Sequence, residues 1–195
     1  FKIKDEQDGS KRYKGRIVVK GYAQIPGVDF TETFAPVASD ATIRIALIYA
    51  LMRRWEVEMI DIEAAFLNAE LDEEMFVEWP DGVVEHGFVT SQEVQRTCIR
   101  ITKAMYGAVQ APRCWGKTFM RILRSNLGLV QSRADPCLFL RFDDAKEVVF
   151  LLVIFVDDLV MIGKKREIER FKCDIQKHFA IVDLGPLKKH LSVWY

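Results

Sequence analysis

The longest apolar stretch of the chain runs over residues 148–162 and is interrupted only by two adjacent carboxylates, Asp157 and Asp158. Residues 148–156 are rich in β-branched and aromatic side chains, and the apolar pattern resumes at 159–162 before Gly163. This pattern predicts a strand, a tight turn and a second strand, with both carboxylates at the tip. A membrane-spanning helix needs about 20 apolar residues, so the stretch is too short to be one.

Hydrophobic periodicity predicts the other elements. Helices are expected at 41–54, from Pro112 to about 127, and around 168–179. Strands are expected at 1–4, 15–21, 56–63, 75–79, 97–101, 180–183 and 191–195, with a turn at Asp8-Gly9 and a polar loop at 80–91. From residue 56 onward the main elements follow the β-α-β-β-α-β order of a ferredoxin-like unit. The sequence therefore predicts an α+β fold.

Three carboxylates are expected to converge in this arrangement. The strand at 56–63 carries Asp61 near its end, and a right-handed crossover places that strand beside the Asp157-Asp158 hairpin. Magnesium prefers carboxylate oxygens, and two such ions catalyse phosphoryl transfer in polymerase-type sites. From the residues alone, the pair is equally well explained as the polar tip of an ordinary hairpin.

Composition narrows the class of protein. Half of the residues are apolar, which predicts a folded globular body, and the 28 basic residues are balanced by 28 acidic ones. Global charge therefore does not indicate a nucleic-acid partner. Four widely spaced cysteines without a C-x-x-C pair argue against a zinc site or a disulfide framework and indicate a reduced, intracellular protein. A chain that lacks an initiating Met and a signal peptide is expected to be a piece of a longer one.

One helix face offers a local basic stripe. Arg113, Lys117, Arg121 and Arg124 share the side of the helix opposite its apolar residues. Such a stripe can follow a phosphate backbone. It is also the ordinary solvated face of an amphipathic helix, and both readings stay open.

Seven blocks of sequence occur in order at residues 14–22, 32–37, 60–71, 103–113, 135–138, 155–158 and 183–185. They include Lys-Gly-Arg-Ile-Val-Val-Lys-Gly-Tyr, Ile-Asp-Ile-Glu-Ala-Ala-Phe-Leu-Asn, Asp-Pro-Cys-Leu and Phe-Val-Asp-Asp. Together these blocks resemble the reverse transcriptase of copia-type LTR retrotransposons, and they cover nearly the whole chain.

The resemblance implies a right-hand polymerase fold consisting of fingers and palm. The palm would be a ferredoxin-like antiparallel sheet with helices on one face. Residues 1–56 would form the first part of the fingers, 57–66 the palm strand with the first catalytic motif, 67–111 the second part of the fingers, and 112–195 the palm. Counterparts of the thumb and RNase H regions would be absent.

The resemblance also implies an RNA-directed DNA polymerase that adds deoxynucleotides to a primer. Asp61, Asp157 and Asp158 would be catalytic and would hold two Mg²⁺ ions, with Mn²⁺ as an alternative. The residues that would bind the nucleotide are Lys14, Arg16, Phe66, Tyr106, Gly107 and Gln110. The bulky Phe66 would collide with a ribose 2′-hydroxyl; a buried core aromatic is the alternative reading of this residue.

The implied partners are an RNA or DNA template with primer, deoxynucleoside triphosphates, and the integrase and RNase H regions of a parent polyprotein, with no membrane. The implied location is the cytoplasm, within retrotransposon particles if the element is active. Ala69, Val109 and Ser192 depart from the family pattern, which leaves a catalytically inactive relic that retains the fold, or a nucleic-acid-binding module, as an alternative. A cyclase-like nucleotidyltransferase is a third reading of the three carboxylates.

Overall fold

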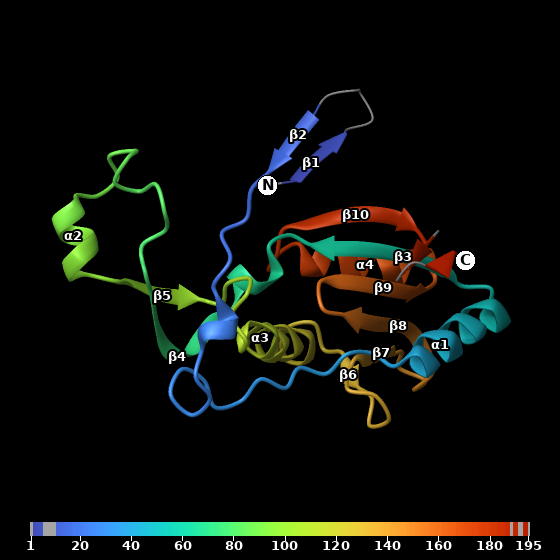
Figure 1. Cartoon of the computed structure of the whole chain (residues 1–195). Helices are drawn as coiled ribbons and strands as arrows, with labels where there is room; N and C mark the ends of the chain where they lie inside the picture. The colour runs from blue at the N-terminus through green and yellow to red at the C-terminus, as the bar shows by residue number, and fades with distance from the viewer. Residues whose placement is uncertain (1, 6–10, 188, 191–192, 195) are drawn as a thin grey trace.

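A six-stranded antiparallel sheet forms the centre of the molecule in the computed structural model, which describes residues 2–5, 11–187, 189–190 and 193–194 (Figure 1). Its strand order is β10-β3-β9-β8-β7-β6. The strands are β3 (Glu56–Ile62), β6 (Val130–Gln131), β7 (Leu138–Phe142), β8 (Val148–Phe155), β9 (Asp158–Gly163) and β10 (Ile181–Pro186). The predicted α+β class with an antiparallel sheet is confirmed.

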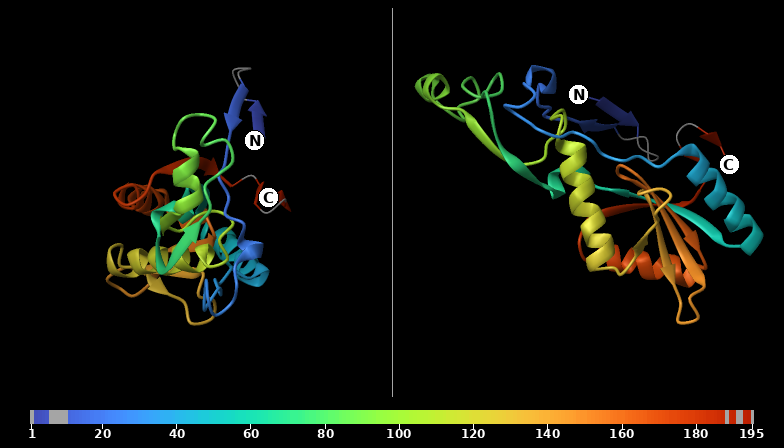
Figure 2. Two further views of the ribbon diagram at one scale, coloured as in Figure 1. Left: turned by 60° about the vertical axis from the view of Figure 1, so that its left-hand side comes forward. Right: turned by 90° about the horizontal axis from the view of Figure 1, so that it is seen from below.

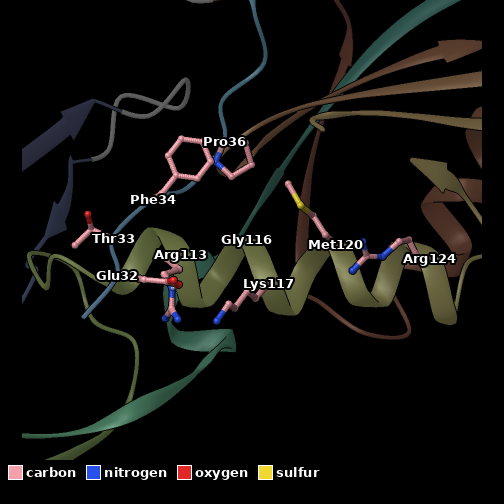
Figure 3. Close-up of a pocket in the computed structure, with 9 residues that line it drawn as sticks. All are labelled: Glu32, Thr33, Phe34, Pro36, Arg113, Gly116, Lys117, Met120 and Arg124. Carbon is pink, nitrogen blue, oxygen red and sulfur yellow. The ribbon is translucent and has the colours of Figure 1, made fainter. Parts of the chain in front are cut away.

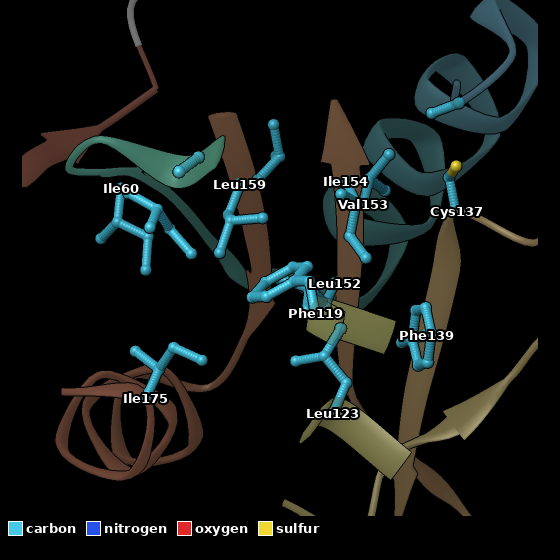
Figure 4. Packing of buried hydrophobic residues seen from close by; sticks show 14 of the residues in the cluster. Ile60, Phe119, Leu123, Cys137, Phe139, Leu152, Val153, Ile154, Leu159 and Ile175 are labelled. Atoms are coloured by element: carbon cyan, nitrogen blue, oxygen red, sulfur yellow. The ribbon is translucent and has the colours of Figure 1, made fainter. Parts of the chain in front are cut away.

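Two helices, α3 (Ala111–Ser125) and α4 (Lys165–Ile175), cover one face of this sheet. Figure 4 shows Phe119 and Leu123 of α3 and Ile175 of α4 directed at Ile60 of β3 and Leu152 of β8. These side chains belong to one continuous hydrophobic core. The order β3, α3, β8, β9, α4, β10 is the predicted β-α-β-β-α-β arrangement.

A third helix, α1 (Asp40–Arg53), contacts β3, β8 and β9 from the other face of the sheet, across from α4 in Figure 4. The middle of β8 is buried on both faces because both are covered. The expectation of helices on one face therefore fits α3 and α4 but not α1. The predicted helix at 41–54 is confirmed, and Ser39 caps it by accepting a hydrogen bond from the Thr42 amide.

An arm of β4 (Glu70–Val77), α2 (Ser91–Arg96) and β5 (Ile99–Lys103) extends away from the sheet (Figure 2). Both strands are shifted from the predicted ranges, and the polar loop is followed by a helix that the periodicity did not indicate. Thr90 and Glu93 form a capping box at its start, in which each side chain bonds the backbone of the other residue. This Thr-x-x-Glu spacing was the available sequence signal.

The N-terminal hairpin pairs β1 (Lys2–Asp5) with β2 (Lys11–Lys14). The predicted strand at 15–21 is wrong, because residues 15–20 have no regular structure and lead into the 3-10 helix η1 (Gly21–Ala23). The Asp8-Gly9 turn lies outside the described residues, as do Leu191, Ser192 and Tyr195 of the last predicted strand. The short strands β11 (Lys189–His190) and β12 (Val193–Trp194) flank that gap.

Within the described ranges, every helix is too short or too polar to cross a membrane.

Candidate active site

Asp61 and Asp158 lie directly opposite each other on neighbouring strands. The register pairs Asp61 of β3 with Asp158 of β9. Side chains of directly opposed residues in an antiparallel pair project from the same face of the sheet, with Cβ atoms about 4.5–5.5 Å apart. The sheet therefore brings together two carboxylates that are far apart in sequence, as the sequence predicts.

Asp157 lies in the two-residue turn that joins β8 to β9. Phe155 and Asp158 are register partners, so the turn consists of Val156 and Asp157. The prediction placed Asp158 at the tip as well, but it is the first residue of β9. The carbonyl oxygen of Asp157 accepts a hydrogen bond of 3.0 Å from the amide of Ile62, the residue after Asp61. This bond connects the turn to β3, the strand that carries Asp61.

The turn makes a second contact, with helix α3. The indole Nε1–H of Trp115 donates a 2.9 Å hydrogen bond to the carbonyl oxygen of Val156. Trp115 is 2% exposed and stacks on Phe119 at 4.9 Å between ring centroids. Trp115 lies among the buried residues of α3, a face that helical periodicity can predict, but periodicity cannot reveal a hydrogen-bond partner in another element.

The acidic side chains influence one another electrostatically. Burial, followed by the negative charge of Asp157, raises the pKa of Asp158 above its ordinary value. Burial also raises the pKa of Tyr106, and the charges of Asp157 and Asp61 act in the same direction while Arg16 opposes them. Tyr106 therefore lies within the electrostatic field of the carboxylates and keeps its proton at neutral pH.

A cluster of Arg16, Phe66 and Tyr106 adjoins the carboxylates. The rings of Phe66 and Tyr106 meet edge to face at 4.9 Å between centroids, and the guanidinium of Arg16 lies 5.2 Å from the centroid of the Tyr106 ring. Phe66 belongs to the 3-10 helix η2 (Ala65–Asn68), which follows β3 and Asp61. Three of the six residues predicted to bind the nucleotide are thus neighbours.

Gly107 is enclosed by backbone. It has φ +90°, and a Cβ there would lie 2.1 Å from the carbonyl oxygen of Val19. A Cβ on Gly21 would in turn lie 1.9 Å from the Gly107 oxygen. The amide of Val19 donates to the carbonyl of Tyr106 at 2.8 Å. The segment from Val19 to Gly21 therefore crosses the Tyr106-Gly107 loop at a distance that only glycines allow.

Gln110 is fully buried beneath this crossing. Its side-chain oxygen accepts a 3.0 Å bond from Nε2 of Gln24, and its own Nε2 donates to the Asp29 carbonyl at 3.3 Å. Gln24 also accepts from the amide of Val109 at 2.9 Å. Through these bonds Gln110 supports the loop. Its side chain has no exposed surface that a nucleotide could contact. No motif or periodicity in the sequence indicated that Gln24 takes part in this contact.

Lys14 ends strand β2, where its backbone pairs with Lys2. Its side chain lies outside the described atoms, so its predicted contact with a nucleotide stays a prediction.

Within the described part of the chain, no three His, Cys, Asp or Glu side chains lie close enough together to hold a metal ion. Of the three predicted metal ligands, Asp61 and Asp158 are opposed by the strand register, and Asp157 precedes Asp158 directly in the chain.

The basic stripe on α3 borders a surface groove of about 470 Å³ (Figure 3). Arg113 donates to Asp72 at 2.6 Å and to Glu32 at 3.0 Å, and its side chain is only 10% exposed. Lys117 also pairs with Asp72, at 3.3 Å. These acidic partners neutralise the first two members of the stripe, so Arg113 serves to join the chain around Glu32 and strand β4 to helix α3.

The structure has an α+β fold in which an antiparallel sheet carries acidic residues at a hairpin. This is the arrangement that the sequence resemblance implied. The chain matches the family described as reverse transcriptase (RNA-dependent DNA polymerase) over residues 1–194. It belongs to this family, and the resemblance to copia-type reverse transcriptases is confirmed.

Among its relatives is the Retrovirus-related Pol polyprotein from transposon TNT 1-94 of Nicotiana tabacum, which is 38% identical over 196 residues, 99% of this chain and 14% of the relative. The Pol polyprotein from transposon RE2 of Arabidopsis thaliana is 34% identical over 99% of this chain and 13% of its own length. The Transposon Ty1-DR4 Gag-Pol polyprotein of Saccharomyces cerevisiae is 26% identical over 95% of this chain and 11% of its own length. This chain thus spans a small part of these polyproteins. No solved structure matches it significantly.

Proposed function

We propose that this chain is an RNA-directed DNA polymerase domain that adds deoxynucleotides to a primer. The observation that carries the proposal is the register of Asp61 opposite Asp158, with Asp157 in the adjoining turn. Directly opposed like charges destabilise a sheet, so a pair of this kind at a strand end indicates a role in binding a cation.

Asp61, Asp157 and Asp158 are the residues that would hold two Mg²⁺ ions, or Mn²⁺ in their place. Their chemistry fits, because Mg²⁺ takes a few carboxylate oxygens and completes its shell with water and substrate phosphates. The ions would supply activation of the primer hydroxyl and charge neutralisation at the phosphates. The protein's own contribution would be to hold the three carboxylates near the end of β3 and the start of β9, on a rigid sheet.

The nucleotide would lie beside the cluster of Arg16, Phe66 and Tyr106. Arg16 supplies a positive charge for the triphosphate, and its stacking on Tyr106 limits where the guanidinium can go. Phe66 presents a ring that would exclude a ribose 2′-hydroxyl, and its contact with Tyr106 fixes the position of this ring. Gly107 lets the backbone approach closely, whereas Gln110 and Gln24 support the loop from below.

In this proposal the sheet with α3 and α4 is the palm, and the β4–β5 arm with the N-terminal segment forms the fingers. Helix α1 belongs with the palm by its contacts, although the sequence boundary at residue 56 assigns it to the fingers. Template, primer and deoxynucleotides are the substrates. Integrase and RNase H regions of a parent polyprotein are the proposed neighbours, and cytoplasmic retrotransposon particles the proposed location.

Primer extension on an RNA template tests the proposal. The wild-type chain should incorporate deoxynucleotides in Mg²⁺, and Asp157→Asn and Asp158→Asn should each reduce incorporation by at least about 100-fold, since even residues that only support metal ligands contribute about 10–100-fold. Asp144→Asn, in the exposed β7–β8 loop, is the matched control. Phe66→Ala should increase use of ribonucleotides relative to deoxynucleotides. Unchanged activity in the Asp157 and Asp158 variants would refute the assignment.

A non-catalytic module that binds nucleic acid is the second candidate. It is favoured by Val109, an exposed apolar residue that departs from the family pattern. Binding of an RNA–DNA hybrid that weakens steeply with salt, without incorporation, would support this candidate. Turnover of a single nucleotide without primer or template would instead support the cyclase-like reading.

A further inference from the structure

The turn that carries Asp157 has an unusual backbone conformation. Val156 has φ +61°, whereas Asp157 is not among the residues with positive φ. Positive φ at only the first central residue is the pattern of a type II′ turn, which normally places glycine there. A β-branched side chain in this region is strained, and such strain persists only where the surrounding structure maintains it.

The alternative hairpin conformation differs by the orientation of one peptide group. Rotating the peptide between the two central residues converts a type II′ turn into type I′, in which both central residues have positive φ. In this chain that peptide joins Val156 to Asp157. The direction of the Val156 carbonyl oxygen therefore defines the orientation of this peptide group. The group that contacts this oxygen therefore selects the turn type and, with it, the φ of Asp157.

Trp115 makes that contact. Its indole Nε1–H donates to the Val156 oxygen at 2.9 Å, while the Ile62 amide holds the Asp157 oxygen at 3.0 Å. The indole cannot easily move, because it stacks on Phe119 and meets Phe179 edge to face at 5.3 Å. The two successive carbonyl groups of the turn are thus each held by an element outside it.

We propose that Trp115 is a positioning residue of the candidate active site, because its indole N–H fixes the Val156–Asp157 peptide and thereby the direction of the Asp157 carboxylate. The consequence for metal binding rests on the proposed function. The consequence for turn conformation does not, since it follows from the hydrogen bond and the strain at Val156 alone.

Backbone NMR of the 195-residue chain tests the turn directly. Trp115→Phe keeps an aromatic ring but removes the N–H, and should give the amides of Asp157 and Asp158 a second set of resonances or broaden them. Adding Val156→Gly should restore a single set, because glycine at the first central position favours the type II′ turn. Phe119→Leu alters the same packing without removing the hydrogen bond and should leave one set. A single unshifted set in Trp115→Phe, or an equal disturbance in Phe119→Leu, would overturn the proposal.

Indole hydrogen exchange in the wild-type chain provides a second measurement that does not depend on a variant that folds. The sequence contains four tryptophans. The Trp115 N–H is buried and bonded and should exchange with solvent much more slowly than that of Trp79, a half-buried residue whose N–H makes a solvent-exposed bond to a Thr97 hydroxyl. Fast exchange at Trp115 would show that the bond to Val156 is not maintained and would overturn the proposal.

Mn²⁺ binding measured by electron paramagnetic resonance tests the functional consequence. Trp115→Phe should weaken binding about 10–100-fold, the usual effect of removing a residue that supports metal ligands, and Val156→Gly in the same chain should recover most of the loss. Unaltered affinity in Trp115→Phe would contradict a positioning role. If the wild-type chain binds no Mn²⁺, the proposed polymerase function fails, and the NMR result still decides whether Trp115 sets the turn.

Discussion

Asp61 and Asp158 face each other across β3 and β9, Asp61 one residue before the end of β3 and Asp158 at the start of β9. An antiparallel sheet gains stability from complementary cross-strand pairs and loses it when like charges are opposed. The same strands contain buried apolar pairs such as Ile60 and Leu159, one position further along. The exception at the strand ends therefore reduces stability in return for a local concentration of negative charge.

The first prediction concerns the effect of pH on this carboxylate pair. Burial and then the charge of Asp157 raise the pKa of Asp158, so protonation is easier in the folded state than in the unfolded state. This contribution to stability is present below the unfolded pKa and is lost as pH rises through the higher folded pKa. Asp158→Asn should therefore be more stable than wild type at pH 7, by less than about 1 kcal/mol because the site is partly solvated.

Urea denaturation of both chains at pH 7 and pH 3 provides the measurement. The difference in unfolding free energy should shrink toward pH 3, where the aspartate is protonated. Asp144→Asn should show no such trend, since that side chain is exposed in a loop. A variant at Asp158 that is clearly less stable at pH 7 would mean that the carboxylate makes a favourable native contact.

The second prediction concerns the crossing of Gly21 and Gly107. Gly21→Ala would place a Cβ 1.9 Å from the Gly107 carbonyl oxygen, and backbone on both sides limits relaxation. We expect a loss of at least about 2 kcal/mol of unfolding free energy in urea denaturation. Gly116→Ala is the matched control, because no atom lies within 4 Å of its Cβ and alanine stabilises a helix interior by about 0.5–1 kcal/mol. Equal effects of the two substitutions would rule out a tight crossing.

Much of the sheet and its helices could be predicted because local pattern and tertiary environment agree there. Three elements have strong hydrophobic periodicity or residues that typically begin or end a helix or strand, and all three are observed: the hairpin around Asp157, the strand that ends near Asp61 and the helix at Pro112. The position of the Asp61 strand beside the hairpin followed from the chirality of the crossover, a general rule that needs no knowledge of side-chain contacts, but the register that opposes Asp61 and Asp158 did not.

The remaining features depend on contacts between distant parts of the chain. Arg113 could be placed on a polar helix face, but its partners Glu32 and Asp72 come from other elements. The role of Gln110 depends on Gln24, which is distant in sequence and meets it only because glycines allow two segments to cross. Periodicity describes one element at a time and therefore cannot identify such pairs.

The third prediction concerns Lys172, a buried lysine of α4. Its Nζ forms ion pairs with Glu58 of β3 and, at 2.7 Å, with Asp183 of β10, and its side chain is 9% exposed. Lys172→Met would leave Glu58 buried without its partner and should cost about 3–5 kcal/mol in urea denaturation at pH 7. Lys177→Met removes an exposed lysine paired with Asp174 and should cost less than about 1 kcal/mol.

Acid should reduce the difference between wild type and Lys172→Met. The hydrogen bond from Lys172 lowers the pKa of Asp183 below its ordinary value of 3.8. A carboxylate with a lowered folded pKa stabilises the fold above its unfolded pKa, and this stabilisation is lost as pH falls through the folded value. A difference in unfolding free energy that is the same at pH 7 and pH 2 would show that packing, rather than charge, accounts for the loss.

The last prediction concerns Asp135, which connects the start of β7 to the start of α1. Its carboxylate accepts bonds from the Thr42 hydroxyl at 2.5 Å, the Ser39 amide at 3.0 Å and the Cys137 amide at 2.8 Å. Burial raises the pKa of Asp135, but these hydrogen bonds outweigh it and the net pKa is lowered. Asp135→Ala leaves the buried Cys137 amide and two part-buried donors without their acceptor and should cost about 2–3 kcal/mol at pH 7.

The control for Asp135 is Asp40→Asn, an exposed residue in the first turn of α1, which should cost only about 0.3–1 kcal/mol through the helix dipole. Because the folded pKa of Asp135 is lowered, its contribution is present above the unfolded pKa and declines as pH falls through the folded value. Wild type and Asp135→Ala should therefore converge in urea denaturation between pH 5 and about pH 2. Hydrogen exchange should locate the lost protection at the N-terminal turn of α1 and the start of β7. Uniform loss across the sheet would instead indicate that Asp135 supports the whole fold and not this junction.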